Sequence, residues 1–241
     1  MIKLFTFLER KPGLTHEEFA DYWSTVHGPL VAATPAFGRH VRRYVQNHAI
    51  TDAAVPELTL SAFDGAGELW FDSVGDLEAT LGDADHHAAL DASAERFVDQ
   101  GSLIRLVAQE SVQWDRGFGR VKFIGLSRRA AAFATREEWI RYWVEVHGPL
   151  AHGVPEFTRY YGRYVHNYVL PHELATGGRE ADFDGIVEEW LDSPEAMARC
   201  LAEPKYLEVV RPDELRFVDF ARSHMLLTEE REIGGGKAGA I

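Results

Sequence analysis

The chain has 241 residues, of which 46% are hydrophobic and 12% aromatic, so it can form one large or two small domains and is not a disordered protein. A single cysteine, Cys200, excludes a disulfide framework, and we assign it to core packing. The net charge of −13 makes nucleic acid a poor partner, because phosphate contacts need clustered Lys and Arg. No apolar run is long enough to cross a membrane, and residues 1–7 resemble a strand and not a signal peptide, so we expect a cytoplasmic protein without a membrane partner.

The pattern predicts, in chain order, strand 2–8, helix 15–27, strands 41–49 and 66–72, helix 73–97 and strand 103–109. The first helix begins with a capping box and buries one face, formed by Phe19, Tyr22, Trp23 and Val26. We expect it to end at Gly28-Pro29, because proline cannot continue a helix.

The same pattern then recurs, since residues 135–167 repeat residues 15–47 with more than half of the positions identical. We therefore predict two domains, 1–112 and 119–231, and a Gly-rich flexible tail at 232–241. The order β-α-β-β-α-β in each predicts the α+β class, with two tandem ferredoxin-like units. Each would leave one sheet face bare, so we expect the units to pair sheet to sheet as a single-chain α/β barrel, an intramolecular pseudo-dimer.

Alternation along the strands indicates which side chains face the barrel interior. In the third strands we place Phe71 and Leu191 against the helices and four polar or aromatic residues in the interior: Glu68, Trp70, Glu188 and Trp190. The second strands present a further set on one face, which we assign to the same cavity: Tyr44, Gln46, His48, Tyr164, His166 and Tyr168. Asn47 and Asn167 then lie against the helices. Because small-molecule sites are concave and mostly apolar, the barrel interior is the predicted site.

A histidine and a buried carboxylate in one cavity suit proton transfer. We assign His48 or His166 as the base, Glu68 or Glu188 as the acid, and Tyr44 or Tyr164 as the group that orients a substrate oxygen. The predicted substrate contacts are Trp70, Trp190, Gln46, Tyr168, His27 and His147. His27 and His147 close the first helix of each unit, where a helix C-terminus favours imidazolium, although a structural cap is the alternative.

Other motifs carry less chemistry. His86-His87 occurs only in the first unit and is assigned to a surface helix, with a pocket rim or a metal ligand as alternatives. The sequence has no Gly-rich phosphate loop, no nucleophile elbow and no His/Cys spacing typical of a metal site. We therefore expect no metal ion and no nucleotide or flavin cofactor.

Four segments carry a family resemblance: Trp23-x3-His27-Gly28-Pro29-Leu30, Tyr44-Val45-Gln46-Asn47-His48, Asp64-Gly65-x2-Glu68-Leu69-Trp70-Phe71-Asp72 and Phe97-Val98-Asp99. With their repeats they resemble the EthD family of the dimeric α/β-barrel superfamily, over nearly the whole chain. The resemblance implies ferredoxin-like units that pair face to face. It associates one branch with alkyl-ether degradation beside a cytochrome P450, and fungal relatives with dehydration of aromatic polyketides. Other superfamily branches include cofactor-free cyclases, quinone-forming monooxygenases and heme proteins.

We therefore expect a cofactor-independent enzyme that dehydrates, cyclises or enolises a small hydrophobic molecule, aromatic or polyketide-like, by proton transfer. Two alternatives stay open: a cofactor-free oxidase of hydrocarbon or ether catabolism, and a non-catalytic ligand carrier. Heme is disfavoured because no single histidine stands out as an axial ligand. The second unit departs from the first at 166–168 and 188–191, which predicts two pockets that are not equivalent, and a further homodimer of the chain stays open.

Overall fold

The computed structural model describes residues 1–53, 55–171 and 183–234. Four strands come from the first unit: β1 (Ile2–Leu8), β2 (Val41–Ala49), β3 (Gly65–Phe71) and β4 (Ile104–Asp115). Four come from the second: β5 (Val121–Ser127), β6 (Arg163–Val169), β7 (Gly185–Leu191) and β8 (His224–Gly234). They form one closed antiparallel barrel in the order β1-β3-β2-β8-β5-β7-β6-β4, so the predicted α+β barrel of two ferredoxin-like units is confirmed.

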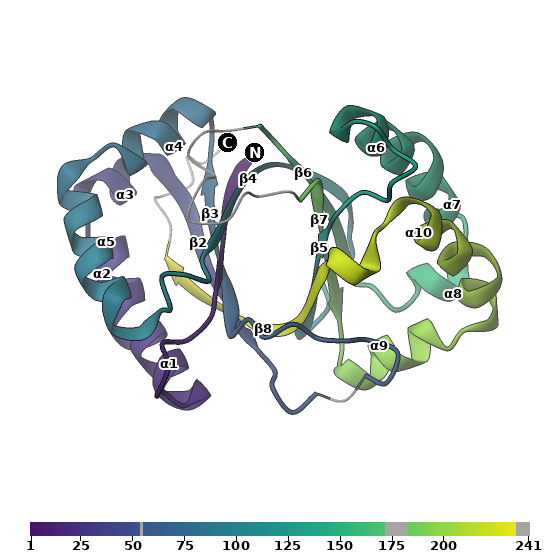
Figure 1. Ribbon diagram of the computed structural model, residues 1–241, viewed down its shortest axis with the longest axis horizontal. Coiled ribbons are helices and arrows are strands. Elements are labelled where there is room, and N and C mark those ends of the chain that lie inside the picture. Colours follow the sequence, from purple (N-terminus) through teal and green to yellow (C-terminus); the bar gives the residue numbers. More distant parts are fainter. Residues whose placement is uncertain (54, 172–182, 235–241) are drawn as a thin grey trace.

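The helices lie outside the barrel, with those of the two units on opposite sides (Figure 1). The first unit has α1 (His16–Tyr22), the π turn η1 (Trp23–His27), α2 (Gly28–Ala32), α3 (Pro35–His40), α4 (Val74–Leu81) and α5 (Ala84–Phe97). The second has α6 (Arg136–Tyr142), η2 (Trp143–His147), α7 (Gly148–His152), α8 (Pro155–Thr158), α9 (Pro194–Leu201), η4 (Tyr206–Val210), α10 (Arg211–Phe217) and the 3₁₀ turn η5 (Phe220–Arg222). None of the described helices is long and apolar enough to cross a membrane.

Long last strands join the two units at two seams, where β4 pairs with β6 and β8 pairs with β2. Both strands continue past the predicted ends, and β8 reaches Gly234, which pairs with Tyr44. The predicted tail is therefore wrong for residues 232–234, which belong to the barrel wall, while 235–241 lie outside the described residues. The seams need these extra residues because a closed barrel leaves no strand edge unpaired.

The first helix does not end at Gly28-Pro29, so that prediction is wrong. The backbone N–H of Gly28 donates to the carbonyl of Trp23, which makes one π turn, and Pro29 then lies in the first turn of α2, where its missing N–H costs nothing. The extra residue in the turn changes which side chains point inward. His27 is buried, whereas Val26 is 45% exposed although helical spacing places it inside. The second unit repeats the device at η2 and α7.

Side chains pack against both faces of the barrel wall. Outside it, the helices of the first unit cover Phe71, which packs with Val31, Phe37 and Leu77, as predicted for that strand face. Inside it, apolar side chains from both units form a single cluster: Phe5, Phe7, Phe63, Ala66, Ile104, Leu106, Ala108, Ile124, Leu126, Val169, Phe183, Ile186 and Leu226. The barrel interior is therefore a packed core.

Candidate functional site

Four charged side chains complete the barrel interior. Lys3 on β1 lies 2.5 Å from Glu188 and 3.3 Å from Glu68, and Lys122 on β5 contacts both of these carboxylates. All four side chains are at most 1% exposed. Because β1 and β7 are not neighbours in the wall, the contact between Lys3 and Glu188 crosses the interior and joins the two units.

Each carboxylate also accepts a hydrogen bond from an amide of its own unit. Asn47 donates to Glu68 and Asn167 donates to Glu188, both at 2.7 Å. The prediction that these asparagines lie against the helices is therefore wrong. Directly opposed residues of paired strands share a face: Val45 lies opposite Glu68 and Val165 opposite Glu188, so Asn47 and Asn167, two residues further along, share the interior face.

The interior carboxylates act as a pair. Burial and the charge of Glu188 raise the pKa of Glu68 to about 7, although Lys122 and Lys3 oppose this. Burial raises the pKa of Glu188 as well, but the two ammonium groups outweigh it and hold that pKa below its usual range. Both carboxylates bind the lysines and lie among packed side chains, so the predicted substrate cavity in the barrel interior is wrong.

The interior tryptophans cover the two ammonium groups. The Nζ atom of Lys3 lies 4.5 Å from the ring centre of Trp70, and that of Lys122 lies 4.6 Å from the ring centre of Trp190. The indole N–H of Trp190 donates to Glu230 at 2.8 Å, and that of Trp70 donates to Glu110 at 3.2 Å. These contacts place Trp70 and Trp190 in the ion network, so their assignment as substrate contacts is unsupported by the geometry.

The predicted bases lie on the other side of the wall. The ring of His48 packs 4.7 Å from that of Trp23, and the ring of His166 packs 4.2 Å from that of Trp143, both beneath the helices. Gln46 donates to the Trp23 carbonyl at 2.9 Å, and Tyr168 packs edge-on against Trp143. Sheet backbone therefore separates both histidines from Glu68 and Glu188, and the predicted common cavity is wrong.

A cavity of about 350 Å³ lies between the sheet and the helices of the first unit. Its apolar lining comes from Leu4, Leu8, Trp23, Val31, Leu69, Leu81, Leu90, Ala94, Phe97, Val98 and Leu103. Its polar lining comes from Thr6, His27, Tyr44, His86, His87, Asp91 and Arg105. An apolar cavity of this size with a few polar groups has the form of a small-molecule site.

His86 lines this cavity and has one ring nitrogen without a hydrogen-bond partner among the described residues. Its Nδ1 atom lies 2.8 Å from the hydroxyl of Thr34, and that hydroxyl donates its own proton to the carbonyl of Val31 at 2.9 Å. With the hydroxyl proton on Val31, the Thr34 oxygen accepts from Nδ1–H, and in this tautomer the lone pair is on Nε2. Nε2 is buried and has no hydrogen-bond partner among the described residues. Burial lowers the pKa of His86, so the ring is neutral at neutral pH.

Three more polar groups line the same cavity. The Nδ1 atom of His27 lies 3.1 Å from the Ser93 hydroxyl, and burial lowers the pKa of His27 to about 4. Burial raises the pKa of Tyr44 to about 12, and its hydroxyl accepts a hydrogen bond from Gln46 at 3.0 Å. Arg105 extends from β4 toward the helices. His27 is thus not the imidazolium expected at a helix end, because the helix continues past it.

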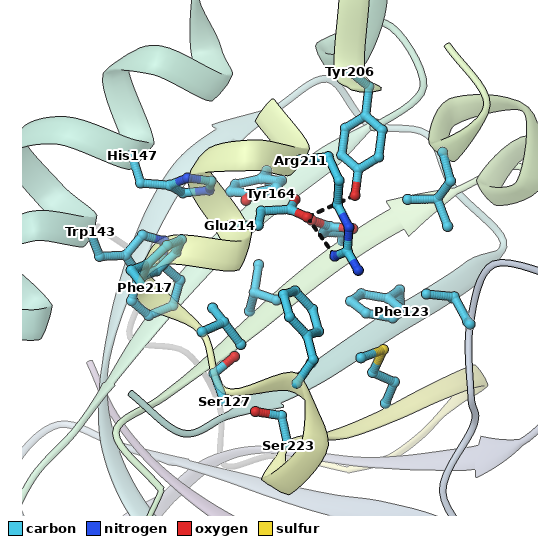
Figure 2. Close-up of a pocket in the computed structure, with 18 of the residues that line it drawn as sticks. Phe123, Ser127, Trp143, His147, Tyr164, Tyr206, Arg211, Glu214, Phe217 and Ser223 are labelled. Atoms are coloured by element: carbon cyan, nitrogen blue, oxygen red, sulfur yellow. Dashed lines mark hydrogen bonds and ion pairs between the residues drawn. The ribbon is translucent and has the colours of Figure 1, made fainter. Parts of the chain in front are cut away.

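The second unit has a smaller pocket of about 90 Å³ at the corresponding place. In Figure 2, Trp143, His147 and Phe217 lie on one side and Phe123 on the other, with Arg211 and Glu214 between them. Leu58, from the first unit, also lines this pocket. The pocket is less than the roughly 150 Å³ cavity that holds a benzene ring. It does not fit a tetrapyrrole.

The polar groups of the second pocket are paired differently. His147 contacts Asp213 at 2.9 Å, and Asp213 accepts a second hydrogen bond from Tyr142 at 2.5 Å. Glu214 accepts from Tyr206 at 2.7 Å and pairs with Arg211 at 3.1 Å.

Two further second-unit side chains lie in or beside this pocket. Glu189 is buried there, and burial and Glu214 raise its pKa to about 8. Tyr164 also lines it and is fully buried, and this burial raises its pKa well above 10.

Cys200 is buried in the helix core, as predicted.

A third hollow, of about 550 Å³, lies over α1 and the end of β2 and includes His48 and Arg231. Its lining also includes four acidic residues, Glu17, Asp21, Asp52 and Glu229. Within the described ranges no group of three or more His, Cys, Asp or Glu residues is placed to hold a metal ion.

Sequence reasoning missed the polar set of the first cavity. His86 was assigned to a surface helix, yet it is fully buried, whereas His87 beside it is exposed. A signal was present in the repeat, because Thr34 and His86 are replaced together by Val154 and Tyr206 in the second unit. A pair that changes together between two copies of one fold indicates a contact.

Comparison with known proteins finds the EthD domain at residues 11–101 and 133–221. No curated protein matches the chain. Among solved structures, a proposed monooxygenase from Fusobacterium nucleatum is 8% identical with a TM-score of 0.56, over 99% of this chain and 95% of that one. A proposed monooxygenase from Lactobacillus acidophilus is 11% identical with a TM-score of 0.52, over 100% and 97%. A chlorite dismutase variant from Candidatus Nitrospira defluvii is 11% identical with a TM-score of 0.53, over 96% and 92%. Likeness at this level is likeness of fold.

Proposed function

The chain belongs to the EthD family, and from that premise we propose that it is a cofactor-independent enzyme that transfers a proton on a small apolar molecule. The reaction takes place in the first-unit cavity, and His86 is the base. One observation carries the proposal: His86 lines a cavity large enough for a substrate, and its buried Nε2 atom has no hydrogen-bond partner among the described residues. The expected reaction class is enolisation, the removal of a proton from carbon beside a carbonyl group.

The chain of hydrogen bonds behind His86 supports this role. Thr34 fixes the proton on Nδ1, so Nε2 always offers its lone pair to the cavity. When Nε2 takes a proton from substrate carbon, Nδ1–H remains bonded to Thr34, and the hydroxyl oxygen stabilises the imidazolium. The same nitrogen then returns the proton to carbon or to a leaving hydroxyl, which links enolisation to dehydration.

The test is exchange of carbon-bound protons for deuterium in heavy water, followed by NMR, with 2-tetralone and phenylpyruvate as probes. We expect the wild-type protein to accelerate exchange of at least one probe, and His86→Leu to lose about 100-fold or more of the acceleration. His40→Leu is the matched control, because His40 pairs with Asp76 away from the cavity. No acceleration of either probe, or equal acceleration by the wild type and His86→Leu, overturns the proposal.

Variants of Thr34 distinguish a catalytic role of His86 from a role in packing alone. Thr34→Val, which introduces the residue of the second unit, removes the acceptor for Nδ1–H and lets the ring adopt the other tautomer. We expect a loss of about tenfold or more that Thr34→Ser restores. Because burial lowers the pKa of His86, exchange should also keep its plateau below pH 6.5 and decline only in more acidic solution.

A further inference from the structure

Arg105 lines the first-unit cavity as a cation without a partner in the part of the chain that the structure describes. It lies on β4 opposite Thr6 of β1, and its side chain is on the helix side of the wall. Among the residues that the structure describes, no side chain forms an ion pair or a hydrogen bond with its guanidinium. Asp91 also lines the cavity, but it is exposed and out of ion-pair contact.

A half-buried guanidinium without a counterion is costly in this position. Burial lowers the pKa of Arg105, and the charge of Asp91 only partly opposes this. Buried charges in proteins are normally paired, because removal from water is expensive. Arginine also differs from lysine in that its planar fork matches the two oxygens of a carboxylate. The missing partner is therefore best supplied by an anion from outside the chain.

The remaining cavity wall describes the rest of the ligand. Aliphatic side chains from β1, β3, α4 and α5 surround the space, and Trp23 and Phe97 add aromatic faces. The second unit has neither the cation nor the open space, because Met225 stands in place of Arg105 and Val187 in place of Gly67. Arg105 thus belongs to the open cavity and not to the shared fold.

We propose that the first-unit cavity takes an apolar carboxylic acid as its substrate, with the carboxylate bound in a two-pronged contact by Arg105. This proposal rests on the proposed function, because it names the substrate class of the same site. The carboxylate anchors one end of the molecule, and the apolar body lies along Trp23 and Phe97 with its reactive carbon toward His86. The carboxylate itself is unchanged in the reaction.

Binding, measured by calorimetry, tests this independently of turnover. The probes are 2-naphthoate and its uncharged isostere 2-naphthamide, neither of which has an exchangeable carbon-bound proton beside a carbonyl group. We expect the wild type to prefer the carboxylate at least tenfold. Arg105→Met, which introduces the residue of the second unit, should lose that preference, Arg105→Lys should keep part of it, and the exposed Arg141→Met should keep all of it.

A second variant locates the binding. A Cβ atom on Gly67 would lie 3.5 Å from Trp23, so the backbone tolerates a side chain there, and Gly67→Val should fill the cavity and weaken both probes. Naphthoate affinity that is unchanged in Arg105→Met, or in Gly67→Val, overturns the inference. His86→Leu tests the two proposals separately, because this variant should bind naphthoate normally while failing to exchange protons. Exchange that depends on His86 with no carboxylate preference would refute Arg105 alone.

Discussion

The two units share one interior and differ in the spaces outside it. Within the barrel, Lys3 and Glu68 of the first unit have the counterparts Lys122 and Glu188, each with the same asparagine and tryptophan contacts. Outside, between sheet and helices, the first unit has about 350 Å³ and the second about 90 Å³. The interior is one structure built by both copies, so a change in either copy affects both. Each outer space belongs mainly to one copy.

Individual replacements account for the difference in volume. Phe123 stands where the first unit has Leu4, and Glu189 where it has Leu69. Tyr206 occupies the place of His86 and lines the second pocket, where its hydroxyl donates to Glu214. The two copies differ in how their polar groups are paired: the second unit fills its pocket with an internal polar network, whereas His86 Nε2 and Arg105 in the first have no partner among the described residues.

The largest effect is expected in the shared interior. Lys3→Met and Lys122→Met each leave two buried carboxylates with one cation, so each should lower the free energy of unfolding by about 3–5 kcal/mol. Both should cost about the same, because the two lysines hold equivalent places between Glu68 and Glu188. Urea unfolding measures both.

Lys205→Met is the matched control, since Lys205 forms an exposed pair with Glu208, and exposed ion pairs contribute little to stability. If replacing one interior lysine lowered the free energy of unfolding no more than Lys205→Met does, the interior would not be a single network of two equivalent halves.

A smaller effect is expected where the outer spaces differ. Burial and Glu214 raise the pKa of Glu189 to about 8, so between pH 4.5 and pH 8 the folded protein holds a proton that the unfolded chain has lost. Stability from this group is therefore full at acidic pH and declines as pH rises toward 8. Glu189→Leu, which introduces the residue of the first unit, should remove that decline and be about 2–4 kcal/mol more stable than the wild type at pH 9.

Urea unfolding at pH 5 and pH 9 distinguishes this from a general packing gain. The exposed Glu137→Leu should follow the wild type at both pH values. A Glu189→Leu protein whose stability changes with pH in parallel with the wild type would show that Glu189 is ionised in the folded state.

The repeat and the local periodicities of the sequence predicted the architecture, because strand alternation and helix spacing are local properties. They did not predict the faces of β2. Alternation fixes that Val45 and Gln46 point in opposite directions, but the register that sets Val45 opposite the interior Glu68 decides which one points inward. Nor could the cavity be located from the sequence. Its volume depends on the sizes of residues that meet only in the folded protein, such as Gly67, which has no side chain to fill the space. The interior position of Glu68 was predicted, while its lysine partners were not singled out.

The smallest effect concerns the histidine pair that the units share. His27 faces Ser93 and His147 faces Asp213, so the same ring has a neutral partner in one unit and an acidic one in the other. Burial, helped by the charge of His86, holds the pKa of His27 near 4.

Ser93→Asp introduces the acidic partner of the second unit and should raise the pKa of His27 by about 1–2 units, since an adjacent carboxylate favours imidazolium. An NMR titration of the imidazole C2 proton measures the change, and Ala92→Asp, which adds the same charge at the exposed neighbouring position, is the control. An equal His27 pKa in the two variants would mean that the partner at position 93 does not determine the charge of the ring. A larger rise of the His27 pKa in Ser93→Asp than in Ala92→Asp would show that the partner at position 93 determines the charge of the ring. Because protonated His27 would then add a second cation beside Arg105, the same variant should also bind 2-naphthoate more tightly at pH 5 than at pH 8.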